Sequence, residues 1–156
     1  MNKLKYLGYS IVFQEVPDEV TLVINISGCP HKCEGCHSKY LWEYKGNYIS
    51  DDLEGLIEKY KELITCVCFM GGDQNPIDLL YCFNIIKQFG LKVCLYSGVE
   101  KLTLLTAMGI SPSCDYVKTG RYNENLGGLN QTTTNQKFYS RINGNLIDTT
   151  HLFQSR

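Results

Sequence analysis

The sequence has almost no net charge and no long apolar run. Its 156 residues contain 15 Lys and Arg against 16 Asp and Glu, a formal net charge of −1. This balance excludes the basic footprint of a nucleic-acid-binding protein. No apolar stretch approaches the roughly 18 residues that a membrane span requires. Internal repeats, low-complexity tracts and linkers are also missing, so we expect residues 1–156 to form a single domain.

The first residues, 1–6, lack the apolar core of a secretory signal peptide. We therefore expect a cytoplasmic protein whose thiols stay reduced. One reactive residue type is nonetheless abundant, because the chain contains eight cysteines. In a reduced protein, clustered cysteines indicate metal ligands or catalytic groups, and scattered cysteines indicate small core residues.

Short apolar runs alternate with segments of helical period along most of the chain. The predicted capping residues are Asp51 with Glu54 for the first helix and Asn75 for the second. The alternation predicts an α/β fold with a parallel sheet and right-handed crossovers. Periodicity does not separate a partial barrel from an open doubly wound sheet. We expect strands at 21–26, 65–70, 91–96, 115–118 and 137–142, and helices at 52–64, from 76 to just before Gly90, and at 100–108.

The first four predicted strands each end in a turn that contains glycine. Ligands of parallel α/β proteins bind beyond the carboxyl ends of the strands. We therefore expect these turns to line one face of the sheet. The segment 120–135 is rich in Gly, Asn and Thr, and it is expected to form a long polar loop that faces a partner. The glycines of the four turns are Gly28, Gly71 with Gly72, Gly98 and Gly120.

Cys29, Cys33 and Cys36 follow the first predicted strand with C-x3-C-x2-C spacing. Three thiolates in one short loop can bind one inorganic centre, and thiolates select zinc or iron–sulfur. His31 or His37 would close a Cys3His zinc site, whereas an iron–sulfur cluster would keep its fourth position open for a substrate. The position after the first strand of an α/β unit, facing the glycine turns, favours the open cluster. The other five cysteines are expected in the core: Cys66, Cys68, Cys82, Cys94 and Cys114.

The cysteine triad after a first strand resembles the cluster loop of the radical S-adenosylmethionine superfamily. The string Gly28–His37 more narrowly resembles the activating proteins of anaerobic ribonucleoside-triphosphate reductase, because Gly35 stands where many superfamily members have an aromatic residue. Three later segments also resemble that family. They are Gly71-Gly72-Asp73 in place of a Gly-Gly-Glu motif, Leu95-Tyr96-Ser97-Gly98 with Ser97 in place of the usual Thr, and Asp115–Tyr122 together with Asn135-Gln136.

The resemblance implies a partial (incomplete) parallel βα barrel of the radical-SAM type. It implies a 4Fe-4S cluster held by Cys29, Cys33 and Cys36, with S-adenosylmethionine on the fourth iron. Reductive cleavage would give methionine and a 5′-deoxyadenosyl radical, which takes hydrogen from a glycine of anaerobic ribonucleoside-triphosphate reductase. The implied electron donor is reduced flavodoxin or a similar protein. The implied contacts of S-adenosylmethionine are Gly35, Cys36, His37, Gly71, Gly72, Asp73, Tyr96 and Ser97.

Some of these contacts have a plainer explanation. Gly71 and Gly72 would present bare backbone to the methionyl amino group and Asp73 would attract its charge, or the three residues form only a strand-to-helix turn. Tyr96 would contact the ribose, or it is a buried tyrosine whose hydroxyl is satisfied within the protein. Three other functions stay open. They are activation of another glycyl radical enzyme, of the pyruvate formate-lyase type, radical chemistry on a small molecule, and a non-catalytic zinc-binding module.

Overall fold

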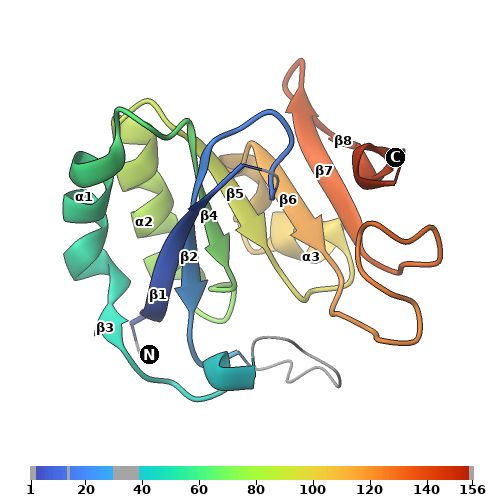
Figure 1. The fold of residues 1–156 in the computed structure, drawn as a ribbon, viewed down its shortest axis with the longest axis horizontal. Helices are drawn as coiled ribbons and strands as arrows, with labels where there is room; N and C mark the ends of the chain where they lie inside the picture. Colours follow the sequence, from blue (N-terminus) through green and yellow to red (C-terminus); the bar gives the residue numbers. More distant parts are fainter. Residues whose placement is uncertain (1–2, 14, 30–38, 155–156) are drawn as a thin grey trace.

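A sheet of eight strands, in the order β3-β1-β2-β4-β5-β6-β7-β8, runs through the molecule (Figure 1). The computed structural model describes residues 3–13, 15–29 and 39–154. The strands are β1 (Lys5–Val12), β2 (Thr21–Ile26), β3 (Asn47–Tyr48), β4 (Cys66–Met70), β5 (Lys92–Tyr96), β6 (Tyr116–Thr119), β7 (Lys137–Ile142) and β8 (Asn145–Asp148). The helices are α1 (Ile49–Tyr60), α2 (Pro76–Gln88) and α3 (Leu102–Ala107), with 3₁₀ helices η1 (Lys39–Leu41), η2 (Ser111–Ser113) and η3 (Thr150–Phe153).

The centre of the sheet is parallel and follows chain order. Strands β2, β4, β5 and β6 pair in parallel as neighbours. Antiparallel strands extend the sheet on both sides, β1 and β3 next to β2, and β7 and β8 next to β6. The sheet is therefore open, with β3 and β8 at its edges. The predicted α/β class and its parallel strands are confirmed, and the antiparallel flanks are an addition to the prediction.

The three α-helices that the structure describes contribute to one hydrophobic core on one face of the sheet. Alternate side chains of β2 lie on opposite faces of the sheet. Leu22 and Ile24 belong to the core on the helix side, and Val23 belongs to a smaller cluster on the other face. The order of the parallel strands never reverses. A doubly wound sheet would place helices on both faces and reverse its strand order. The described residues thus form a singly wound sheet, which excludes the doubly wound alternative.

The local sequence patterns predicted most element bounds closely. Strands β2 and β7 have the predicted bounds, and the described part of 120–135 is loop, as predicted. Strands β1, β3 and β8 were not predicted. Strand β1 contains Gly8 and an irregular register between Tyr6 and Tyr9, which obscures its alternation. None of the described helices is long and apolar enough to cross a membrane.

The capping box predicted for α1 is wrong. The helix begins three residues earlier than expected, at Ile49, and its N-cap residue Tyr48 makes no side-chain capping hydrogen bond. The Ile49 amide instead donates to the Leu4 carbonyl at 3.1 Å. The start of α1 is therefore set by a contact with the N-terminal segment, which a local capping pattern cannot reveal.

The predicted cap of α2 is confirmed. Oδ1 of Asn75 accepts a hydrogen bond from the Asp78 amide at 3.2 Å, and Pro76 occupies the first turn. Replacing Asn75 by alanine is expected to lower the free energy of unfolding by about 1 kcal/mol, because this amide loses its acceptor. Urea denaturation measures the change. The exposed Asn84→Ala variant in the same helix is the matched control, and equal stability of the two variants would contradict the prediction.

Candidate functional site

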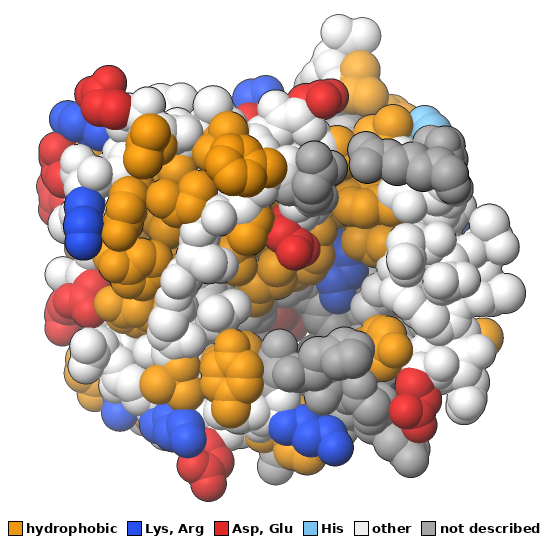
Figure 2. Space-filling model, in the orientation of Figure 1, with side chains coloured by type: hydrophobic (Ala, Val, Ile, Leu, Met, Phe, Trp, Pro, Cys, Tyr) orange, Lys and Arg blue, Asp and Glu red, His pale blue; other side chains and the backbone are white. Residues whose placement is uncertain are grey.

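The turns that follow the four parallel strands converge on one pocket, as predicted. Its walls come from the carboxyl ends of β2, β4, β5 and β6, from the turns after them, and from the end of η1 with the residue that follows it, and its volume is about 260 Å³. Figure 2 shows that this face of the molecule is hollowed, with hydrophobic side chains around the hollow. We call this cavity the strand-end pocket. Its described lining is Asn25, Ile26, Cys29, Leu41, Trp42, Met70, Gly71, Asp73, Gln74, Tyr96, Ser97, Gly98, Lys118, Arg121, Tyr122 and Gln136.

Cys29 lies in the wall of the strand-end pocket and is held there by backbone hydrogen bonds. Its amide donates to the Leu41 carbonyl at 2.9 Å, and the amide of Gly28 donates to the Glu43 carbonyl at 3.1 Å. The segment after β2 is therefore fastened to residues 41–43. The other predicted residues of the cysteine loop, Gly35, Cys36, His37, Cys33 and His31, lie outside the described residues. Their assignment as ligands and contacts stays a prediction.

The turn Gly71-Gly72-Asp73 requires glycine for its backbone conformation. Gly71 and Gly72 have φ angles of 98° and 118°, which side chains rarely adopt. A Cβ on Gly72 would also lie 3.0 Å from Cδ1 of Leu79, which belongs to the core. Gly71 and Asp73 line the strand-end pocket, and Asp73 is only 8% exposed. The fold thus requires glycine at both positions, and Gly71 and Asp73 also form part of the pocket wall.

Gln74 ties this turn to the cysteine segment, a role that the sequence did not indicate. Its Oε1 accepts from the Gly72 amide at 3.1 Å, and its Nε2 donates to the Ser27 carbonyl at 3.3 Å. Ser27 and Gln74 are 47 residues apart in the chain. One side chain therefore sets the spacing between the β4 turn and the residues that lead into Cys29. No local motif signals this contact, because Gln74 simply follows the glycine turn.

Tyr96 and Ser97 both line the strand-end pocket, at the end of β5. The Tyr96 hydroxyl donates to the Glu15 carbonyl, so its hydroxyl has a partner within the protein. Burial, followed by the nearby thiols, raises the pKa of Tyr96 well above its usual value. Oγ of Ser97 accepts from the Val99 amide at 3.0 Å. The satisfied hydroxyl agrees with the plainer explanation of Tyr96, and its ring still forms part of the pocket wall.

The structure brings together the two C-terminal segments singled out in the sequence, 115–122 and 135–136. Nε2 of Gln136 donates to the Gly120 carbonyl at 3.2 Å, and Nδ2 of Asn135 donates to the Arg121 carbonyl at 3.1 Å. Gly120 has a φ of 96°, and a Cβ there would lie 3.1 Å from Cα of Gln136. Glycine is thus required where the two segments meet. This contact closes the base of the loop at 120–135.

Lys118 braces the ends of β5 and β6 against each other. Its ammonium donates to the carbonyls of Ser97 and Gly120, both at 3.1 Å, and it lies 5.5 Å from the centre of the Tyr96 ring. A lysine in this position keeps two glycine-bearing turns together at the pocket wall. Sequence reasoning missed this role, because Lys118 looks like any polar residue at the end of a strand.

The five remaining described cysteines are core residues, as predicted. All are buried, and none of them lines the strand-end pocket. Burial raises the pKa of the Cys82 and Cys114 thiols to about 12, and it also raises the pKa of Cys66 and Cys94. These four thiols therefore stay protonated and unreactive at neutral pH. Among the described residues, no three Cys, His, Asp or Glu side chains converge to hold a metal ion.

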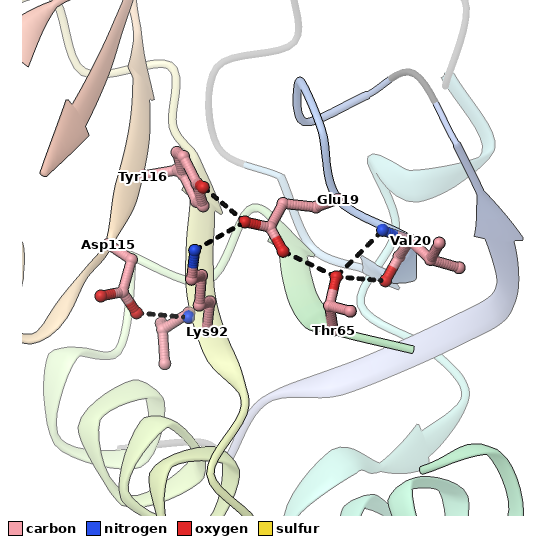
Figure 3. A network of polar contacts seen from close by, with 7 residues as sticks. Glu19, Val20, Thr65, Lys92, Asp115 and Tyr116 are labelled. Atoms are coloured by element: carbon pink, nitrogen blue, oxygen red, sulfur yellow. Dashed lines mark hydrogen bonds and ion pairs between the residues drawn. The ribbon is translucent and has the colours of Figure 1, made fainter. Parts of the chain in front are cut away.

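A buried carboxylate ties together the opposite, amino-terminal ends of the parallel strands (Figure 3). Glu19 precedes β2 and is 6% exposed. It accepts hydrogen bonds from the Thr65 hydroxyl at 2.6 Å, the Lys92 ammonium at 2.9 Å and the Tyr116 hydroxyl at 2.5 Å. These donors stand just before β4 and at the starts of β5 and β6. Burial acts to raise the pKa of Glu19, but the three hydrogen bonds outweigh it and lower the pKa below its usual value.

The lowered pKa of Glu19 makes its contribution to stability depend on pH. A group with a depressed folded pKa stabilises the protein above the unfolded pKa, about 4.3 for glutamate, and that stabilisation is lost as pH falls through the folded pKa. The stability difference between the wild-type protein and Glu19→Gln should therefore be largest at neutral pH and shrink as the pH falls below about 4.3 towards the lower pKa of the folded state. Urea midpoints across this range measure it. A difference that does not change with pH would contradict the prediction.

One comparison with known proteins identifies a family for most of the chain. A family model described as "4Fe-4S single cluster domain" matches residues 19–142. This range begins at Glu19 and ends at Ile142, the last residue of β7. It therefore contains the cysteine segment and the described lining of the strand-end pocket. The searches of curated proteins and of solved structures found no significant match.

Proposed function

Because the chain belongs to the 4Fe-4S single cluster domain family, we propose that it is a radical S-adenosylmethionine enzyme whose cluster is held by Cys29, Cys33 and Cys36. We further propose that it activates a glycyl radical enzyme, the anaerobic ribonucleoside-triphosphate reductase. The observation that carries the proposal is the position of Cys29. It lies in the wall of a pocket at the carboxyl ends of four parallel strands, a wall that also includes Gly71 and Asp73.

The described residues fit such a cluster in two respects. The only cysteine of the described pocket wall is Cys29, and the other described cysteines are buried core residues. A fourth thiolate from the described part of the chain is therefore excluded, which supports an open coordination position. In the same wall, Nε1 of Trp42 is buried without a hydrogen-bond partner among the described residues. A buried donor of this kind needs an acceptor that a sulfur-rich or nucleoside ligand would provide.

A bound cluster would supply the electron that splits the sulfur–carbon bond of S-adenosylmethionine, giving methionine and a 5′-deoxyadenosyl radical. The protein's own residues would orient the substrate. The Asp73 carboxylate would attract the methionyl ammonium, and the Gly71 backbone would leave room for it. Lys118 and Gln74 would keep the surrounding turns at fixed spacing, through the contacts described above. The largely apolar wall would limit the access of water to the reacting atoms.

The open sheet supports a macromolecular target in place of an enclosed small substrate. In the described residues the parallel strands do not close into a barrel, and the loop at 120–135 stands at the pocket's border through Arg121 and Tyr122. A glycine on a partner protein could then approach the pocket. The singly wound sheet, with its α-helices on one face, is the arrangement that a partial βα barrel requires. We prefer the reductase over other glycyl radical enzymes because the string Gly28–His37 and the segments 115–122 and 135–136 resemble the activating proteins of that reductase.

The proposal is tested by cluster analysis followed by radical transfer. Anaerobically reconstituted protein should be brown, contain iron and sulfide, and cleave S-adenosylmethionine when dithionite reduces it. Incubation with an anaerobic ribonucleoside-triphosphate reductase should then produce a glycyl radical signal in electron paramagnetic resonance. If the glycyl radical forms only on an enzyme of the pyruvate formate-lyase type, then that enzyme, and not the reductase, is the target. A colourless protein with one tightly bound zinc ion would overturn the enzyme in favour of a zinc-binding module.

Asp73 gives a direct test of the substrate contact. The Asp73→Asn variant should bind S-adenosylmethionine about tenfold more weakly, because a charge-assisted contact to the ammonium becomes a neutral one. Its iron content should equal that of the wild-type protein. Equilibrium dialysis of cluster-loaded protein measures the affinity, and Glu54→Gln on the exposed side of α1 is the control. Unchanged affinity in Asp73→Asn would assign this residue to the turn alone.

A further inference from the structure

The single tryptophan of the chain, Trp42, forms part of the wall of the strand-end pocket. It directly follows η1. Its indole ring can donate one hydrogen bond, through Nε1, and is not an acceptor. This nitrogen is buried and has no hydrogen-bond partner among the described residues. A buried donor without a partner carries its full desolvation cost, so the group is a candidate contact for a ligand of the pocket.

The backbone holds Trp42 against the segment that contains Cys29. The carbonyl of Leu41, just before Trp42, accepts the Cys29 amide at 2.9 Å. The carbonyl of Glu43, just after Trp42, accepts the Gly28 amide at 3.1 Å. Trp42 is therefore bracketed by the two hydrogen bonds that fasten the start of the cysteine segment. A group bound by Cys29 in the pocket would be held beside the residue that carries the indole ring.

The ring of Trp42 is contacted by Lys39, which cannot accept its hydrogen bond. Nζ of Lys39 lies 5.9 Å from the ring centre. An ammonium group only donates hydrogen bonds, so it interacts with the π face of the ring and leaves the indole N–H unpaired. Ile26 and Leu41, which line the same pocket, present only carbon atoms from their side chains. The acceptor for Nε1 must therefore be looked for in a bound group.

The position of Cys29 indicates which bound group provides that acceptor. Among the described cysteines, Cys29 alone is not buried, and it shares the pocket wall with Trp42. Asp73, Tyr96 and Ser97, the described side chains expected to contact the nucleoside substrate, belong instead to the ends of β4 and β5 and the turns after them. The indole nitrogen is thus on the cysteine side of the pocket, which favours cluster sulfur over the nucleoside as its acceptor.

We propose that Nε1 of Trp42 donates a hydrogen bond to a sulfur atom of the cluster, a sulfide or a ligating thiolate, and that this bond raises the reduction potential of the cluster. The inference rests on the proposed function, and it adds a residue that sets how readily the cluster accepts an electron. Reduction by one electron makes the sulfur atoms more negative, so a donor to sulfur stabilises the reduced form more than the oxidised form. Burial of the nitrogen away from water strengthens the bond.

Spectroscopy of the unmodified protein tests the hydrogen bond directly. Because the chain contains one tryptophan, tryptophan labelled with nitrogen-15 in its indole ring marks a single nitrogen. The reconstituted protein, reduced with dithionite in the absence of S-adenosylmethionine, should show a coupling of the cluster spin to this nitrogen and to a proton that exchanges in deuterium oxide. Electron–nuclear double resonance measures both. If the nitrogen coupling is absent, the hydrogen bond is refuted, and if it appears only after S-adenosylmethionine is added, the nucleoside is the acceptor and the assignment to the cluster is wrong.

The Trp42→Phe variant tests the effect on the potential. Phenylalanine keeps an aromatic ring but has no N–H group, so the midpoint potential of the cluster should fall by about 59 mV, which corresponds to a tenfold smaller equilibrium constant for one-electron reduction. Anaerobic spectroelectrochemical titration measures it. An equal or higher potential in Trp42→Phe would contradict the proposal. If this variant takes up no cluster, the double-resonance measurement on the labelled wild type decides.

Tyr44→Phe is the matched control for the titration. It also removes one hydrogen-bond donor from the residues that follow η1, but the Tyr44 hydroxyl donates to the Lys3 carbonyl at 2.6 Å, and Tyr44 is not part of the described pocket wall. The cluster of this variant should have the wild-type potential. A fall as large as that in Trp42→Phe would show that the potential responds to any change in this segment, and not to the indole N–H.

The measurements separate this inference from the proposed function. A wild-type protein that loads a cluster and cleaves S-adenosylmethionine, but shows no nitrogen coupling, would refute the role of Trp42 and leave the proposed function intact. A cluster that shows the coupling but does not support cleavage would confirm the hydrogen bond and overturn the proposed function. A wild-type protein that takes up no iron–sulfur cluster would overturn both.

Discussion

The Cys29→Ala variant is expected to lose the iron–sulfur cluster and all cleavage of S-adenosylmethionine. The proposed cluster has only three protein ligands, so removing one thiolate leaves it with two. The structure offers no replacement among the described residues, because every other described cysteine is buried in the core. Cys33→Ala and Cys36→Ala should behave in the same way. Iron and sulfide analysis after anaerobic reconstitution measures the loss, together with the release of methionine under dithionite.

Cys82→Ala is the matched control for the cluster variants. Cys82 lies in α2, is fully buried, and has a pKa raised to about 12 by burial. Its thiol is a core group, so the variant should keep full iron content and cleavage activity. Its free energy of unfolding should fall by roughly 1 kcal/mol, because the missing sulfur leaves a small cavity. Retention of cluster in all three loop variants, or its loss in Cys82→Ala, would refute the ligand assignment.

Replacing Glu19 by alanine is expected to cause the largest loss of stability of any single change considered. Its carboxylate accepts from Thr65, Lys92 and Tyr116, whose backbones belong to the amino-terminal ends of three different strands. Removing it leaves the Tyr116 hydroxyl and the Lys92 ammonium without this acceptor, and leaves the Thr65 hydroxyl only the Val20 carbonyl, at 3.4 Å. The expected cost is about 3 kcal/mol, at the low end for a buried ion pair because Lys92 is half exposed. For a domain of this size the melting temperature should fall by roughly 6–12 °C.

The Glu19 variant also tests the division of the sheet into a structural end and a functional end. The strand-end pocket lies at the opposite ends of the same strands, so Glu19→Ala should still load a cluster and bind S-adenosylmethionine well below its melting temperature. Glu58→Ala is the control, because its ion pair with Lys61 at 3.0 Å is exposed and should contribute less than about 1 kcal/mol. Equal losses in the two variants would show that the buried network does not stabilise the fold.

Much of the fold could be predicted because its signals are local. The bounds of β2 and β7 follow from short runs of apolar and β-branched residues, and the end of α2 follows from Gly90, whose φ is 74°. The cap at Asn75 joins residues only three apart. The start of α1 could not be predicted, because it depends on the contact of Ile49 with Leu4. Strand β1 was missed for a related reason, since its pairing with β2 outweighs an irregular local pattern.

By itself the sequence determined the chemistry available to this protein: three closely spaced cysteines after a strand, glycine turns after four strands, and an alternation that requires a parallel sheet. These are properties of neighbouring residues. Only the tertiary structure decided that the α-helices share one face, that Gln74 joins the β4 turn to the cysteine segment, and that Glu19 closes the other end of the sheet. Glu19 and Tyr116 are 97 residues apart. The energy of such a contact exists only once the intervening chain has folded, so no local pattern records it.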